Sequence, residues 1–349
     1  MAPSVVLVTG VSRFLGGHLA ARLAADPAVG RVIGVDTVPP GRDLRTRMGR
    51  AEFVRADIRN PLIAKVVARA EVDTVVHAAL SPDPSRAGGS ATKEMNVLGT
   101  MQLLAAAQSA PSVRRVVVES TTAVYGASSL DPALFDETMT PNDLPSGGYA
   151  RDAAEIEGYV RGVARRRSDV AVSVLRFASV VGPRIDTPLA RYFALPVVPT
   201  VLGYDARLQL LHEEDALAVL GRAVAHDLPG TFNVAADGVL MLSQAIRRAG
   251  RVALPVPGPA FGTAWRTLAA ARVVSPPEPP LDFGRVVDTA LLRTGFGFTP
   301  RWTTTQAFDD FVHARALRPV LGPERVAAAE RLVDRGVHAA ARVLAGSRA

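Results

Sequence analysis

The chain has 349 residues, of which 48% are hydrophobic, and a formal net charge of +7. It contains no cysteine, which excludes disulfide bonds, thiolate zinc sites and a cysteine nucleophile, and a core of this size needs no such support. Lysine occurs only at Lys65 and Lys93 while all other basic side chains are arginines, a bias typical of GC-rich coding DNA, so we expect no nucleic-acid partner.

Up to about residue 180, short β-branched runs alternate with stretches at helical spacing, which is the pattern of parallel βαβ units. We expect strands at residues 5–9, 31–36, 52–56, 74–78, 115–120 and 170–176, and helices at 14–25 and 149–166. These strands are nearly continuous apolar runs, which belong in a sheet that helices cover on both faces. Residues 1–180 are therefore predicted to form a doubly wound parallel α/β sheet.

The second half of the chain is less regular. After Gly182 the alternation loosens and prolines cluster at 255–259 and 276–280, which predicts a smaller lobe over 181–322 with some segments returning to the first sheet. Residues 323–349 are predicted to form a C-terminal amphipathic helix, which packs on the protein or lies on a membrane surface. With no targeting segment and no apolar stretch of roughly twenty residues, we expect a soluble, cytoplasmic protein.

The first predicted strand runs into a glycine-containing turn, Thr9-Gly10-Val11-Ser12-Arg13-Phe14-Leu15-Gly16. Gly10 and Gly16 let the chain turn tightly and bring a helix N-terminus against a pyrophosphate. Asp36 stands twenty residues beyond Gly16 at the end of the second strand, where a carboxylate can hold both ribose hydroxyls. The combination predicts a dinucleotide site of the Rossmann type, and the carboxylate favours NAD over NADP.

Further motifs follow along the chain. They are Asp57-Ile58-Arg59, Val76-His77-Ala78-Ala79, Asn96-Val97-Leu98-Gly99-Thr100, Ser120-Thr121-Thr122-Ala123-Val124-Tyr125-Gly126, Leu175-Arg176 with Val181-Gly182-Pro183, His212-Glu213-Glu214-Asp215 and Phe232-Asn233-Val234. Together with the glycine turn, this series resembles the extended short-chain dehydrogenase/reductase family, the nucleotide-sugar epimerases and dehydratases, over nearly the whole chain. The resemblance places the last of these motifs on a strand of the smaller lobe.

The resemblance implies a set of site residues and a substrate class. It assigns cofactor binding to Gly10, Arg13, Phe14, Leu15, Gly16, Asp36, Asp57, Ile58, His77, Ala78, Ala79, Asn96, Ser120 and Tyr149. In that family a tyrosine, whose pKa is lowered by a lysine four residues later, takes the proton of a substrate hydroxyl, and a serine or threonine hydroxyl shares it. These roles fall to Tyr149 and Thr121. The implied substrate is a nucleotide sugar, bound between the two lobes, and a homodimer is common in the family.

The main departure from the family pattern is the missing lysine. Its position is Ala153, and no lysine follows Lys93 anywhere in the chain. Without the ammonium group a tyrosine of pKa about 10 is ionised in only about one molecule in a thousand at neutral pH. Arg151 and Arg176 are candidate surrogate cations, although Arg151 follows Tyr149 by two helical positions and so points away from it. Tyr149 with a purely structural role is the alternative.

A second departure is Arg13, which replaces the middle glycine of the family's turn. Its guanidinium can pair with phosphate oxygens, favour a 2′-phosphate and so NADP, or turn out to solvent. Asp36 argues against NADP by charge repulsion. The residues therefore favour NAD without deciding where the Arg13 side chain lies.

Three further observations narrow the range of reactions and ligands that we expect. Thr122 and Ala123 stand where sugar dehydratases of the family carry an Asp-Glu pair, so we expect no dehydration. Glu119 is unusual for the family, and we expect it either near the nicotinamide or in a salt bridge at the sheet edge. His77 ends a buried strand with no partner at ligand spacing, so we expect a core histidine and no metal.

The sequence as a whole predicts an NAD(P)-dependent oxidoreductase or epimerase that acts on a nucleotide sugar or a related hydroxyl substrate. The alternative is a non-catalytic scaffold or sensor protein that keeps NAD(P) as a bound ligand, and the missing lysine motivates it.

Overall fold

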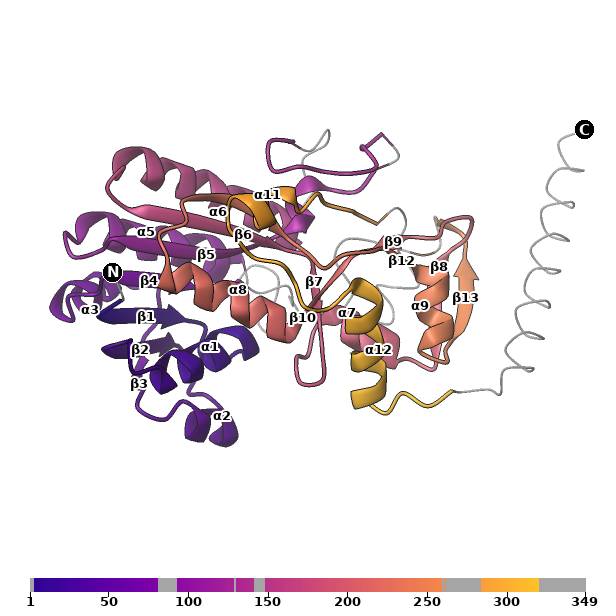
Figure 1. The fold of residues 1–349 in the computed structure, drawn as a ribbon, viewed down its shortest axis with the longest axis horizontal. Helices are drawn as coiled ribbons and strands as arrows, with labels where there is room; N and C mark the ends of the chain where they lie inside the picture. Colours follow the sequence, from indigo (N-terminus) through magenta and orange to yellow (C-terminus); the bar gives the residue numbers. More distant parts are fainter. Residues whose placement is uncertain are drawn as a thin grey trace, which may run out of the picture.

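A computed structural model describes residues 3–80, 93–128, 130–140, 148–258, 261 and 284–319. Its centre is a seven-stranded sheet in the order β11-β6-β5-β4-β1-β2-β3, and every neighbouring pair is parallel (Figure 1). The strands are β1 (Val5–Thr9), β2 (Arg31–Asp36), β3 (Glu52–Arg55), β4 (Thr74–His77), β5 (Arg115–Thr121), β6 (Ala171–Phe177) and β11 (Gly230–Val234). The predicted doubly wound α/β fold is confirmed. The strand order reverses between β1 and β4, because β2 and β3 follow on one side of β1 whereas β4, β5 and β6 follow on the other. Sheets of this kind bind their ligands at that point.

Helices cover both faces of this sheet, as the apolar strands require. They are α1 (Phe14–Ala25), α2 (Arg42–Arg47), α3 (Leu62–Arg69), the π-helical turn η2 (Glu94–Leu98) leading into α5 (Gly99–Ser109), the 3-10 turn η3 (Thr122–Tyr125), α6 (Gly148–Arg166), α8 (Glu213–Ala225) and α11 (Ala290–Thr294). α1 packs against α2 and α8 on one face, while α3, α5 and α6 pack side by side on the other (Figure 1).

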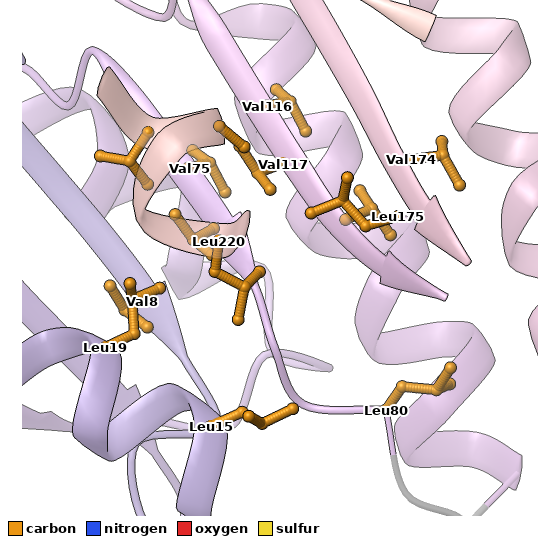
Figure 2. Packing of buried hydrophobic residues seen from close by; sticks show 14 of the residues in the cluster. Val8, Leu15, Leu19, Val75, Leu80, Val116, Val117, Val174, Leu175 and Leu220 are labelled. Carbon is orange, nitrogen blue, oxygen red and sulfur yellow. The ribbon is translucent and has the colours of Figure 1, made fainter. Parts of the chain in front are cut away.

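The core lies between the sheet and these two helix layers. Figure 2 shows Leu19 of α1 and Leu220 of α8 beside the valines of β1, β4 and β5. Strand alternation gives β5 two different faces: Arg115 points to the α8 side, where it bonds to Asp227, and Ser120 points to α6, where it bonds to Glu157. Side chains at odd-numbered and even-numbered positions of β5 therefore meet different surroundings.

The remaining elements form a smaller lobe with its own core. They are β7 (Ser179–Val181), α7 (Pro188–Ala194), β8 (Val197–Val201), β9 (Arg207–Leu208), β10 (Leu210–His212), β12 (Leu240–Met241), α9 (Leu242–Arg248), β13 (Val252–Val256) and α12 (Thr304–Ala314). The aromatic rings of Phe193, Phe308 and Phe311 are buried at its centre. Figure 1 shows α7, α9 and α12 gathered at the end of the molecule away from β3.

One placement from the sequence is wrong. The Phe232-Asn233-Val234 strand was expected in the smaller lobe, but β11 pairs with β6 and forms the outermost strand of the large sheet. The reason is that α8 returns the chain across the face that α1 covers, and a parallel strand must then follow at the nearest free edge.

Two expectations concern residues outside the described part of the chain. The predicted C-terminal amphipathic helix, 323–349, and the proline cluster at 276–280 both lie there. Within the described residues, no helix has the length and apolar character needed to cross a bilayer.

Candidate active site

The turn between β1 and α1 is packed so closely that it requires glycine. Gly10 has a φ of +76°, and a Cβ there would lie 2.4 Å from the carbonyl oxygen of Ala78 at the end of β4. A Cβ on Gly16 would lie 2.5 Å from the carbonyl oxygen of Gly10. Arg13, the N-cap residue of α1, makes no capping bond with its side chain, so among the described residues the first N–H groups of the helix stay available to an anion. The turn therefore fits a pyrophosphate.

Asp36 is held beside this turn. Its Oδ2 accepts the Ser12 N–H at 3.0 Å, and its Oδ1 accepts the Thr37 N–H at 2.7 Å. The carboxylate is thus fixed at the end of β2 with lone pairs left for further donors. This is the position that the sequence predicted for binding ribose hydroxyls.

Asp57 and Ile58 lie after β3 and are occupied by neighbours. Asp57 forms an ion pair with Arg59 at 2.7 Å, and hydrogen bonds from Arg59 lower the pKa of that carboxyl. Ile58 is buried, and its side chain fills the space beside Gly99 of α5. The predicted contact of these residues with a cofactor stays a prediction.

A cavity of about 440 Å³ opens at the carboxyl ends of the sheet strands, against the smaller lobe. Six of the predicted site residues line it: Arg13, Phe14, Leu15, Ala78, Thr121 and Tyr149. The glycine turn and the two predicted catalytic residues therefore share one space. The other predicted residues are not among those that line it: Gly10, Gly16, Asp36, Asp57, Ile58, His77, Ala79, Asn96 and Ser120.

Thr121 and Tyr149 reach the cavity from β5 and α6. The Thr121 hydroxyl accepts the Ala123 N–H at 3.1 Å, which caps η3 and leaves the hydroxyl proton free to be donated. Tyr149 lies in the first turn of α6, and Ala153, one turn later, is fully buried in the core. Residue 153 therefore supplies no cation to the tyrosine.

Asn96 holds the start of α6 in place. Its amide donates to the Asp152 carboxylate at 3.1 Å, and both residues are buried. Burial raises the pKa of the Asp152 carboxyl. Because Asp152 follows Tyr149 by three residues, this bond fixes the helical turn that carries the tyrosine.

His77 is a core histidine, as expected. Its Nδ1 lies 2.8 Å from the Thr9 hydroxyl and its Nε2 lies 2.8 Å from the Thr100 hydroxyl. Thr100 donates its proton to the Asn96 carbonyl, so Nε2–H must donate to Thr100 while Nδ1 accepts from Thr9. Burial, aided by the Arg13 charge, lowers the pKa of His77 to about 4, and the ring stays neutral.

Ser120 belongs to a buried polar network on the opposite face of β5. Its hydroxyl donates to Glu157 at 2.6 Å, and Arg176 donates to the same carboxylate through Nε at 3.0 Å and Nη2 at 2.7 Å. Arg176 also donates to the Tyr125 hydroxyl at 2.6 Å, and Tyr125 donates to Asn233 at 2.8 Å. Arg176 is therefore engaged by Glu157 and is no surrogate for the missing lysine.

The Arg13 side chain lies against the cavity and influences the groups at the ends of β4 and β5. Burial raises the pKa of the Glu119 carboxyl from 4.5 to about 7, and the Arg13 charge opposes that rise. Arg13 is half-buried and lines the cavity, and the pairing of its guanidinium with phosphate oxygens stays a prediction.

Sequence reasoning missed the arginines that the smaller lobe contributes to the cavity, namely Arg184, Arg191, Arg207 and Arg285. Arg184 forms ion pairs with Glu213 and Glu214, and its guanidinium lies 5.4 Å from the centre of the Phe14 ring. Arg207 and Arg285 each donate to a backbone carbonyl. In a chain with arginine as its common cation, no local pattern distinguishes these four from the rest.

Comparisons with known proteins agree with the fold and identify the family. Residues 6–235 match the model of the NAD dependent epimerase/dehydratase family. An uncharacterised protein of Mycobacterium tuberculosis is 55% identical over 331 residues, which cover 93% of this chain and 87% of that protein.

Two solved structures are similar in fold. A UDP-glucose 4-epimerase of Thermotoga maritima, solved with UDP-glucose, has a TM-score of 0.69 at 19% identity and covers 89% of this chain and 98% of its own. A UDP-glucuronic acid 4-epimerase of Bacillus cereus, solved with UDP-glucuronic acid and NAD, has a TM-score of 0.69 at 18% identity, with coverages of 90% and 100%.

Proposed function

Because this chain belongs to the NAD-dependent epimerase/dehydratase family, we propose that it binds NAD and oxidises a hydroxyl of a nucleotide sugar, either transiently as an epimerase or finally as a dehydrogenase. The observation that carries the proposal is the single cavity that joins the α1 turn to Thr121 and Tyr149. A site of this kind needs the cofactor and the proton-transfer groups in one enclosed space.

The residues of the turn fit NAD. Because Gly10 has no Cβ, the turn packs closely against the residues after β4, and because Gly16 has none, the start of α1 packs against Gly10. The start of α1, where the Arg13 side chain makes no capping bond, supplies N–H donors for the pyrophosphate. Asp36 offers a fixed carboxylate to the ribose hydroxyls and repels a 2′-phosphate, which selects NAD over NADP. When bound, NAD accepts a hydride from the carbon that bears the substrate hydroxyl.

Thr121 and Tyr149 handle the hydroxyl proton in this proposal. Thr121 donates its hydrogen to the substrate oxygen, since its hydroxyl oxygen accepts the Ala123 N–H and its proton points elsewhere. Tyr149 lies against the same cavity, held by the Asn96–Asp152 bond one turn away. A tyrosine without a lysine partner is a weak base at neutral pH, so another group must help to take the proton.

The substrate class follows from the charge of the smaller lobe's wall and from the relatives. Arg207 and Arg285 present guanidinium groups that suit phosphate oxygens. The two structural neighbours hold UDP-glucose and UDP-glucuronic acid. Thr122 and Ala123 provide no acid–base pair, so we propose no dehydration.

The first test is isothermal titration of the ligand-stripped protein with NAD, NADH, NADP and NADPH. Micromolar binding of the NAD pair, weaker by about tenfold or more for the NADP pair, is the expected result. Tyr149→Phe and Thr121→Val should then each lower turnover of UDP-glucose or UDP-glucuronic acid. Variants that match the parent rate would refute the assigned roles, and tight NAD binding without any turnover would favour the scaffold alternative.

We propose a homodimer in the cytoplasm, which sedimentation velocity and cell fractionation would test. We further propose that residues 323–349 contact a membrane surface. Deletion of this tail should then release the protein from lipid vesicles.

A further inference from the structure

Glu119 points into the same cavity as the predicted catalytic pair. It precedes Thr121 by two residues on β5, so strand alternation directs both side chains to one face. Both residues line the cavity, while Ser120 between them faces Glu157 on the other side of the sheet. Glu119 is therefore placed at the reacting end of the proposed site.

The carboxyl of Glu119 has no partner in the described part of the chain. No hydrogen bond or ion pair joins it to another described residue, although every other buried acid near the site has one, such as Asp152 with Asn96 and Glu157 with Arg176. A carboxyl without a partner in protein surroundings costs stability. The cost is offset when the occupant of the cavity supplies a donor.

We propose that Glu119 is the proton acceptor of this site and takes over the task that the family gives to its lysine-supported tyrosine. The inference rests on the proposed oxidation of a substrate hydroxyl. The substrate O–H bond breaks and its proton forms a bond to a Glu119 carboxylate oxygen, directly or through the Tyr149 hydroxyl, which passes on its own proton. The C–H bond breaks with its electron pair leaving as hydride for NAD, so the alcohol becomes a carbonyl, NAD is reduced and the carboxylate becomes a carboxylic acid.

The electrostatics suit an acceptor that works at neutral pH. Burial raises the pKa of Glu119 to about 7, with Arg13 opposing the rise, so about half of the molecules carry the carboxylate at pH 7. An unsupported tyrosine offers only about one phenolate in a thousand at that pH. A base with a pKa near the working pH is the efficient choice for proton transfer.

The two histidines near Glu119 both have pKa values below their usual 6.5. Those lining the cavity are Arg13, His18, Tyr149, Arg184, Asp186, Arg191, Arg207 and Arg285, and His77 ends the neighbouring strand. The pKa of His77 is about 4, and burial lowers the pKa of His18 below its usual 6.5. A rate that changes with a midpoint near pH 7 is therefore assigned to Glu119.

The test compares Glu119→Gln, Glu119→Asp and the control Glu155→Gln, whose side chain lies on α6 and accepts the Tyr159 hydroxyl. Conversion of UDP-glucose and UDP-glucuronic acid is followed from pH 5 to 9, both as NADH formation and as formation of the epimer. The parent kcat should rise with pH through a midpoint of about 7. Glu119→Gln should lose about 100-fold or more in kcat together with this midpoint, Glu119→Asp should keep a midpoint, and the control should match the parent.

A second readout needs neither cofactor nor substrate. Carbon-13 NMR of protein labelled at its glutamate carboxyls, with Glu119→Gln to identify the signal, should give a midpoint of about 7 that rises further in Arg13→Gln. A Glu119 midpoint at the ordinary value near 4.5 overturns the inference, as does an active parent whose rate and profile Glu119→Gln leaves unchanged. A parent that turns over no sugar nucleotide overturns the proposed function itself, and the two failures are thereby distinguished.

Discussion

Glu119→Gln should stabilise the folded protein, and more at alkaline than at acidic pH. In the parent, the folded state holds the Glu119 proton up to a pKa of about 7, whereas the unfolded chain releases it near 4.5. Between these values the folded state binds more protons, so the Glu119 contribution to the free energy of unfolding falls as pH rises and is constant above pH 7. Glutamine has no proton to lose and removes this dependence.

The size of the effect follows from the two pKa values. At 1.36 kcal/mol per pH unit, the raised pKa of Glu119 lowers the free energy of unfolding by about 3 kcal/mol at pH 8 and about 1 kcal/mol at pH 5. Water in the cavity screens part of this cost, so these figures are upper values. The variant should therefore gain about 2 kcal/mol more over the parent at pH 8 than at pH 5.

Urea unfolding followed by circular dichroism at pH 5 and pH 8 measures both differences. Comparing parent and variant at the same pH cancels every other titrating group. Glu155→Gln on α6 is the control and is measured at the same two pH values. An equal gain for Glu119→Gln at both pH values, or a larger gain at pH 5, would refute the argument that burial holds the proton on this carboxyl.

Three further predictions concern the surroundings of the cavity. Gly10→Ala should lower stability by about 2 kcal/mol or more and abolish NADH binding in a fluorescence titration, while Gly41→Ala, with nothing within 4 Å of its new Cβ, should do neither. Glu157→Gln should cost about 3–5 kcal/mol in urea unfolding, because Arg176 is left buried with its charge uncompensated. As pH falls from 6.5 to 4, the His77 contribution to the free energy of unfolding should fall by up to about 3 kcal/mol, because the unfolded chain protonates His77 first. The free energy of unfolding of His77→Gln should therefore gain on that of the parent between pH 7 and pH 4.5, a difference in which the opposite contribution of Glu119 cancels.

A control variant and two contradicting outcomes test these predictions. Glu155→Gln, two residues from Glu157 on the same helix, should change stability by no more than about 0.5 kcal/mol. A Glu157→Gln protein that unfolds at the parent's urea concentration would show that the network carries no net energy. Tight NADH binding by Gly10→Ala would show that the turn accommodates a side chain.

Most of the large sheet could be predicted from the sequence because its strands are short β-branched runs between turn residues. The predicted strands at 5–9 and 31–36 and the helix at 14–25 coincide with β1, β2 and α1. The β11 strand was misplaced because a local pattern shows that a strand exists but not which edge it joins. Pairing is decided by the course of α8, which the sequence pattern does not describe.

The site was predictable to the extent that motifs fix backbone positions. The glycine turn, Thr121 and Tyr149 were placed by motif and share the cavity. The partner of a buried side chain was not predictable: Glu157 is 37 residues from Ser120 and carries no motif, yet it binds that hydroxyl.

The alternation of side chains along β5 limits which kinds of mutation this strand can accept. Glu119 faces the cavity and Ser120 faces the Glu157 carboxylate, and β4 and β6 fix the register of the strand from both sides. Insertion or deletion of one residue upstream in β5 would exchange the two faces, turning a serine to the cavity and a second carboxylate toward Glu157. The strand can therefore accept substitutions at single positions. A change in its length would at once remove Glu119 from the cavity and break the hydrogen bond between Ser120 and Glu157.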